Sequence, residues 1–167
     1  GEIRADLHGD KKALQPFLPR FGLRLFLPQE CNQVTYLGYG PNESYIDKRR
    51  ASYIGKFTSS VSDMHEDYIK PQENGSHWDC RYLKVASSDR SLTAAGDSFS
   101  FNLSHYTQEE LTTKMHNFEL VKSGYAVLCL DAQMGGIGSN SCGPELLPQY
   151  RVGAKPIEMH LTLTPGC

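Results

Sequence analysis

The sequence has 167 residues, of which 39% are hydrophobic and 22% are charged, and its formal net charge is −2. This composition is typical of one globular domain, and the charge favours neither nucleic acid nor a membrane surface as a partner. No apolar run approaches the ~20 residues of a bilayer-spanning helix, and the first residues lack the basic and apolar regions of a signal peptide. We therefore expect a single domain over residues 1–167 in a cytoplasmic protein.

Short runs of alternating apolar residues follow the chain in order. Residues 1–15 are expected to form an extended start and a polar turn, and to be poorly ordered. A capping-box spacing between Thr107 and Glu110 predicts one short helix. Many short strands between Gly/Pro-rich turns predict an all-β, antiparallel β-sandwich. The predicted strands cover residues 21–27, 33–37, 51–60, 77–85, 91–95, 98–103, 125–131 and 157–163.

The most informative stretch is Tyr36–Arg50, which combines aromatic, small and charged residues. Gly38 and Gly40 flank Tyr39 and precede Pro41, so we expect a strand to end near Leu37 and the chain to turn there. Beyond the turn, a phenol, carboxylates and guanidinium groups follow closely. This chemistry suits either a ligand site or a set of ion pairs that braces the turn. The residues concerned are Glu43, Tyr45, Asp47, Arg49 and Arg50.

Acidic and aromatic residues offer further candidates, each with a plainer alternative. Glycoside hydrolysis needs two carboxyl groups about 5–10 Å apart, which sequence spacing does not establish, and salt-bridged acids in loops are commoner. Amphipathic aromatics suit stacking on sugars, yet packing is the commoner role. The acidic groups are Glu43 with Asp47, Asp63 with Glu66 and Asp67, and Glu73; the aromatics are Tyr39, Tyr45, Tyr68 and Trp78.

Histidine and cysteine positions indicate no metal site. The six histidines are scattered, and the five cysteines lack Cys-x-x-Cys spacing, so we expect neither metal ligands nor a disulfide framework. The glycine-rich segment Gly135–Pro144 lacks the strand-to-helix context of a phosphate-binding loop. Its Ser and Asn side chains are suited to hydrogen-bond a sugar hydroxyl.

Several unusual strings, in order along the chain, resemble one family. The sequence is similar to the C-terminal domain of glycoside hydrolase family 2 β-galactosidases, also found as the small subunit of two-chain β-galactosidases. The matching strings run from about residue 16 to the end of the sequence. They are Leu18–Leu23, Gly38–Arg49, Ser62–His65, Pro71–Gly75, Phe101–Thr107 and Met134–Pro144.

The resemblance implies a galactose-mutarotase-like β-sandwich, of which this chain is only the C-terminal part. It also implies that the two catalytic glutamates lie on a separate TIM-barrel domain, so no catalytic residue and no metal ligand is assigned here. The family's Mg²⁺ and monovalent cation would bind on that catalytic domain, and no cofactor is expected in this chain. The expected partners are the remaining domains or a large subunit of β-galactosidase, within an oligomer.

One substrate-contacting loop follows from the resemblance. In well-known members a tryptophan of the glycine-rich loop reaches into the active site beside the sugar, and Cys142 occupies the matching position here. Cysteine offers no comparable stacking surface, so the aromatic contribution is in doubt. Asn140, Ser141 and Cys142 are therefore the candidate substrate-binding residues at the edge of the pocket.

The expected function is that of an accessory domain. The whole enzyme would be a retaining β-galactosidase that hydrolyses terminal non-reducing β-D-galactose from lactose and other β-galactosides, and the chain alone would be inactive. The domain would complete the active-site rim and the subunit contacts. The alternatives are a free-standing carbohydrate-binding module, and a sugar mutarotase that rests on fold analogy alone.

Overall fold

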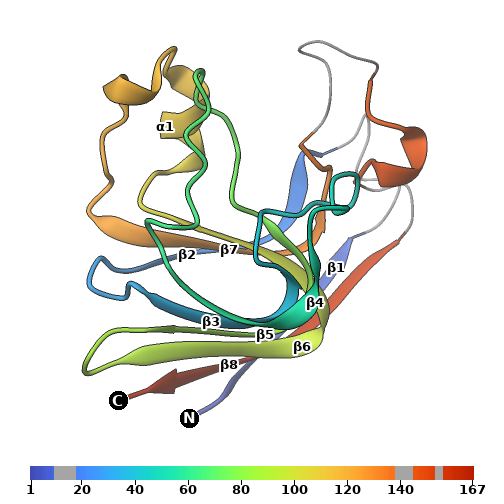
Figure 1. The fold of residues 1–167 in the computed structure, drawn as a ribbon. Helices are drawn as coiled ribbons and strands as arrows, with labels where there is room; N and C mark the ends of the chain where they lie inside the picture. Colours follow the sequence, from blue (N-terminus) through green and yellow to red (C-terminus); the bar gives the residue numbers. More distant parts are fainter. Residues whose placement is uncertain (10–17, 138–144, 153–155) are drawn as a thin grey trace.

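The computed structural model describes residues 1–9, 18–137, 145–152 and 156–167. These residues form eight strands, one α-helix and two 3₁₀ turns (Figure 1). No helix among them is long and apolar enough to span a bilayer. The helical elements are α1 (Gln108–Thr113), η2 (Asn117–Glu119) and η3 (Pro148–Tyr150). The strands are β1 (Ile3–Gly9), β2 (Arg20–Pro28), β3 (Gln33–Gly40), β4 (Tyr53–Ser60), β5 (His77–Ala86), β6 (Ser91–Ser104), β7 (Tyr125–Met134) and β8 (Ile157–Gly166).

All strands pair antiparallel, and the sheet divides at the long strand β6 (Figure 1). The first half of β6, Ser91–Gly96, lies between β5 and β8, and β8 pairs with β1. Its second half, Ser100–Ser104, pairs with β7, which in turn pairs with β2. On the other side of β5 lie β3 and β4. The predicted all-β antiparallel sandwich with one short helix is confirmed.

Two predicted strand boundaries are wrong, and both errors involve glycine. The runs at 91–95 and 98–103 are one strand, because pairing with β5, β7 and β8 carries β6 past Gly96. Likewise, β3 does not end near Leu37 but continues to Gly40. A Cβ atom at Gly38 would overlap the side chain of Cys80 on the neighbouring strand, so this glycine permits close packing rather than a turn.

The N-terminal segment differs from the expectation of poor order in residues 1–15. Ile3–Gly9 forms β1, which pairs along its whole length with β8 from the other end of the sequence. Such a distant partner leaves no local signal in the sequence. Residues 10–17 lie outside the described part of the chain.

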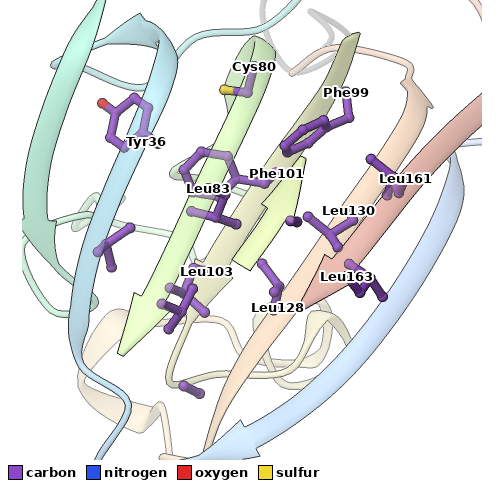
Figure 2. Close-up of a cluster of buried hydrophobic side chains, with 14 of the residues drawn as sticks. Tyr36, Cys80, Leu83, Phe99, Phe101, Leu103, Leu128, Leu130, Leu161 and Leu163 are labelled. Carbon is purple, nitrogen blue, oxygen red and sulfur yellow. The ribbon is translucent and has the colours of Figure 1, made fainter. Parts of the chain in front are cut away.

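The hydrophobic core lies on the inner face of the divided sheet (Figure 2). Large side chains from neighbouring strands point to the same side, among them Tyr36, Leu83, Phe101, Leu128 and Leu161. Each side chain of this size contributes roughly 1.5–3 kcal/mol when it is fully buried. The two arms, β8 with β1 and β7 with β2, supply side chains to this one cluster. The core therefore holds both arms in place, and with them the loops at their ends.

Core and outer positions on neighbouring strands should respond very differently to truncation. Leu83 on β5 is fully buried, whereas Leu37 on β3 points to the outer face and is 39% exposed. We predict that Leu83→Ala lowers the free energy of unfolding by about 2–5 kcal/mol and that Leu37→Ala lowers it by less than about 1 kcal/mol. Urea denaturation of both variants measures the difference. Equal losses would contradict the assignment of the two faces.

Acid should destabilise the core through His77. This side chain is 2% exposed, its Nδ1 lies 3.0 Å from the Tyr39 carbonyl oxygen, and its ring stacks on Phe101. Burial disfavours the charged imidazolium and lowers the His77 pKa to about 4 from its ordinary value of 6.5. The unfolded chain then binds more protons between these two values, so stability falls as the pH is lowered through this window.

We predict a loss of about 3 kcal/mol from His77 between pH 6.5 and pH 4. The His77→Gln variant should be less stable at neutral pH but should lose this part of the pH dependence. His116→Gln, at an exposed position, is the control for replacing a histidine. Urea denaturation at a series of pH values provides the test, and an unchanged slope in His77→Gln would count against it.

Candidate functional site

A buried carboxylate organises the stretch Tyr36–Arg50. Glu43 is 7% exposed and accepts hydrogen bonds from Lys48 Nζ at 2.5 Å, from the backbone N–H of Gly75 at 2.9 Å and from the Tyr68 hydroxyl. The Tyr45 hydroxyl donates at 3.3 Å to Glu43 Oε2, the oxygen that also accepts from Gly75. Burial alone would raise the pKa of Glu43, but these donors outweigh it and lower the pKa. Glu43 is thus a fixed anion that ties this stretch to the long β4–β5 connection.

Asp47 contacts the start of the glycine-rich loop. Its Oδ1 accepts a hydrogen bond from the backbone N–H of Ile137 at 3.4 Å. Gly136 has φ of 76°, and a Cβ atom there would overlap the Asp47 carboxylate. On the other side, the Gly135 N–H donates to the carbonyl of Pro19 at 2.8 Å. The first stem of the loop is therefore fixed by two segments distant in sequence, and only glycine fits against Asp47.

A cleft of about 170 Å³ opens beside both stems of this loop. Met134, the last residue of β7 before the loop, and Tyr150 of η3 after the loop both line it. Ile46 and Trp78 are also among the lining residues. No carboxylate is among the lining residues that the structure describes. The cleft thus offers apolar and hydrogen-bonding surface but no acid–base pair for glycoside chemistry.

Trp78 contributes one edge of this cleft rather than an open stacking platform. The guanidinium carbon of Arg49 lies 4.3 Å from the centre of the Trp78 ring, and the Tyr39 ring centre lies 5.2 Å from it. Tyr45 is 2% exposed, and the half-buried Tyr68 has Lys48 Nζ 5.9 Å from its ring centre. Arg49 is accordingly a cation–π partner of Trp78. For these aromatics the packing interpretation fits the geometry better than sugar stacking.

The acids of the β4–β5 connection do not converge on one point. Asp63 accepts from the Ser60 hydroxyl at 2.7 Å, whereas Asp67 accepts from the Asn117 side chain at 2.8 Å. At Glu66 it is the backbone N–H that bonds, donating to the Asn74 side-chain oxygen at 3.2 Å. Asp63 thus caps a turn, and Asp67 links the connection to η2.

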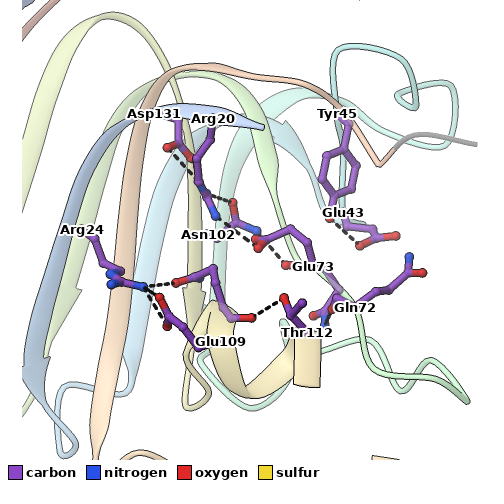
Figure 3. Close-up of polar contacts among 12 residues, drawn as sticks. Arg20, Arg24, Glu43, Tyr45, Gln72, Glu73, Asn102, Glu109, Thr112 and Asp131 are labelled. Atoms are coloured by element: carbon purple, nitrogen blue, oxygen red, sulfur yellow. Dashed lines mark hydrogen bonds and ion pairs between the residues drawn. The ribbon is translucent and has the colours of Figure 1, made fainter. Parts of the chain in front are cut away.

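Sequence reasoning missed the buried ion pair between Arg20 and Asp131 (Figure 3). Arg20 Nε donates to Asp131 Oδ1 at 3.0 Å, and Arg20 Nη2 donates to Asp131 Oδ2 at 2.5 Å and to Asn102 Oδ1 at 2.9 Å. Glu73 Oε2 lies 3.2 Å from Arg20 Nη1. A signal was present in the sequence: Asp131 ends the apolar run 125–131, and a carboxylate that is buried with such a strand needs a cation.

Two carboxylates share the single Arg20 guanidinium in this cluster. Burial raises the pKa of Asp131, with Arg20 opposing the rise. Burial likewise raises the pKa of Glu73; Arg20 lowers it and the Asp131 charge raises it further. A raised carboxyl pKa is a common property of a general acid, but Glu73 is not among the residues lining the cleft. Its place against Arg20 indicates a structural role.

The predicted substrate-binding residues Asn140, Ser141 and Cys142 lie outside the described residues, so they stay predictions. Within the described chain, no group of three or more His, Cys, Asp or Glu side chains is arranged to hold a metal ion. Three of the four described cysteines, Cys31, Cys80 and Cys129, are buried free thiols, and burial raises the pKa of each; Cys167 is exposed. Such buried thiols are poor nucleophiles.

An antiparallel sandwich in which distant segments hold the loop stem Gly135–Ile137 defines an all-β domain. The family model described as the β-galactosidase small chain matches residues 1–163, and the chain belongs to this family. It is 51% identical over 152 residues to a β-galactosidase of Actinobacillus pleuropneumoniae, covering 91% of this chain and 15% of that protein. It is 42% identical over 162 residues to a β-galactosidase of Staphylococcus xylosus, covering 96% of this chain and 16% of that protein.

A third β-galactosidase, from Lactobacillus delbrueckii subsp. bulgaricus, is 32% identical over 166 residues, covering 98% of this chain. The chain spans about 16% of the length of that relative, and a similar share of the other two. The similarity therefore concerns one domain of much longer proteins.

Removing Arg20 should be far more damaging than removing a surface arginine on the same strand. Arg24 pairs with Glu109 at 2.7 Å, but both side chains are exposed. We predict that Arg20→Leu lowers the free energy of unfolding by about 3–5 kcal/mol because Asp131 is left buried without a cation. Arg24→Leu should cost less than about 1 kcal/mol.

The double variant Arg20→Leu with Asp131→Leu should recover part of the loss, since neither charge is then buried alone. Chemical denaturation of the three variants measures these effects. Similar losses in Arg20→Leu and Arg24→Leu would contradict the importance of the buried pair.

Proposed function

We propose that this chain is the accessory domain of a retaining β-galactosidase that hydrolyses terminal β-D-galactose from lactose and related β-galactosides. Family membership and the small share of each relative that it spans support this role. The domain would complete the rim of the active site through its glycine-rich loop and would contribute subunit contacts. The reacting carboxylates would come from the rest of the enzyme.

The observation that carries the proposal is the way the loop stem is held. Asp47 and Pro19 fix Gly135–Ile137 from opposite sides, and the cleft lies next to this stem. Meanwhile Glu43 and Glu73 are each held by a cation. The charged groups of the domain thus hold a loop in position. Positioning alone can strongly affect a reaction in a neighbouring site.

The direct test removes the domain from the complete enzyme. We expect the enzyme without residues 1–167 to lose β-galactosidase activity or assembly, and to regain both when the 167-residue chain is added. Hydrolysis of a chromogenic β-galactoside and analytical ultracentrifugation provide the two readouts. Unchanged activity and assembly without the domain would overturn the accessory role.

A free-standing carbohydrate-binding module makes a different prediction. Such a module would release or absorb heat when the chain alone is titrated with millimolar lactose. The accessory domain should give none, because its pocket needs the rest of the enzyme and its Trp78 ring already carries Arg49.

The loop stem offers a sharper test with a matched control. Gly136 and Gly124 both have positive φ, 76° and 81°, but only at Gly136 would a Cβ atom meet another group. In the complete enzyme we predict that Gly136→Ala lowers kcat/KM by about tenfold or more, because displacement of a positioned loop is costly to catalysis. Gly124→Ala carries the same backbone strain without the overlap and should keep kcat/KM within about twofold of wild type.

Steady-state hydrolysis of lactose by the two variants, with melting temperatures recorded alongside, provides the measurement. If both variants lost activity equally, backbone strain rather than loop position would be responsible.

A further inference from the structure

The outer face of β3, β4 and β5 carries a shallow groove. Side chains alternate along these strands, so that Val34, Tyr36 and Leu83 enter the core while their neighbours face outward. The groove has a volume of about 530 Å³ and is lined by Thr35, Leu37, Lys56, Tyr82 and Lys84. It lies on the opposite side of the sheet from the core shown in Figure 2.

Apolar surface occupies the middle of this groove. Leu37 pairs across the strands with Lys56 on one side and Tyr82 on the other. Leu37 is 39% exposed, and Ile54, two residues before Lys56, is 60% exposed. A wet sheet face normally places polar residues at such central positions. Adjacent exposed apolar side chains in a groove are more typical of a surface that another polypeptide covers.

Two lysines flank this apolar centre, and within the described chain neither has an ion-pair or hydrogen-bond partner. Lys56 stands opposite Leu37, whereas Lys84 stands opposite Thr35 on the far side of β3. The strand segments 33–39, 54–60 and 82–86 contain no acidic residue. The groove is therefore positive in a chain whose net charge is −2.

We propose that this groove docks a polypeptide segment of the same β-galactosidase from outside these 167 residues. That segment would place an apolar side chain between Leu37 and Tyr82 and carboxylates on Lys56 and Lys84. The inference rests on the proposed accessory function, in which the chain adjoins several times its own length of polypeptide, as in the relatives. Charge complementarity selects an acidic segment, since opposite potentials favour docking and like charges disfavour it.

The same groove of a second copy is a poorer occupant. A two-fold contact pairs each surface patch with itself, so it would bring the two pairs of lysines together. Juxtaposed like charges oppose association. The edge of β4 supports a polypeptide occupant in another way, because among the described strands β4 pairs with β3 alone and its second edge is open beside the groove.

Lysine reactivity in the complete enzyme tests the proposal. We expect Lys56 and Lys84 to react with an acetylating N-hydroxysuccinimide ester at least about tenfold more slowly than Lys70, an exposed lysine of the β4–β5 connection, because paired and covered amines are protected. Carbodiimide, which joins amines directly to carboxylates, should link Lys56 or Lys84 to an Asp or Glu outside residues 1–167. Mass spectrometry of proteolytic fragments identifies both products.

Charge reversal adds a second measurement. In the complete enzyme, Lys56→Glu with Lys84→Glu should abolish these cross-links and raise acetylation of the groove tyrosine, Tyr82, about tenfold. Lys70→Glu is the control and should leave the cross-links unchanged. A near-ultraviolet circular dichroism spectrum like that of wild type confirms that the variant is folded.

Two results would overturn the proposal. One is equal acetylation of Lys56, Lys84 and Lys70 without cross-links; the other is cross-links only to a second copy of this domain, detected by mixing ¹⁴N- and ¹⁵N-labelled enzyme. Either result in an enzyme that still requires the domain for activity would leave the accessory function standing. If the enzyme were instead fully active without the domain, the accessory function itself would be wrong.

Discussion

The half-buried Arg20 guanidinium, paired with the buried Asp131, is the constraint on which the arrangement of the loops depends. It sits at the first residue of β2, makes a two-pronged contact with Asp131 on β7, and reaches Asn102 on β6 and Glu73 before β5. A buried carboxylate without a partner is costly, so this geometry discriminates strongly against other registers of β2 on β7. The register in turn brings Pro19 to the Gly135 N–H, where the glycine-rich loop begins. One ion pair thereby couples the arm of the sheet to the loop beside the cleft.

The stretch Tyr36–Arg50 provides a second set of contacts that hold the loop stem. Its Glu43 is a permanent anion enclosed by donors, and its Asp47 occupies the space next to Gly136. Of the two interpretations that its residues allowed, the brace accounts for the contacts of Glu43, Lys48 and Asp47. These charged groups hold loops in position. Such a role suits a chain that spans only a small share of the length of its relatives.

Periodicity located the strands well, because alternation reflects burial on one face and needs no knowledge of the partner strand. It failed where tertiary packing overrode a local signal: Gly38 indicated a turn, yet it lies inside β3 against Cys80. The pairing of β1 with β8 and the contact of Arg20 with Asp131 join residues far apart in sequence, and local patterns do not identify the partner in either case. For the candidate site, the motifs pointed to the glycine-rich loop, whereas the groups that hold its stem emerged only in three dimensions.

In the proposed function, this domain positions a loop at a galactoside site whose reacting groups lie elsewhere. A crystal structure of the complete enzyme with a bound, unreactive β-galactoside provides the test. Residues of the glycine-rich loop or its stems should contact the sugar, whereas Glu43, Glu73 and Asp131 should stay paired with their cations and distant from the sugar. A carboxylate of this chain within hydrogen-bond distance of the glycosidic oxygen, or a ligand with no part of this domain near it, would contradict this role.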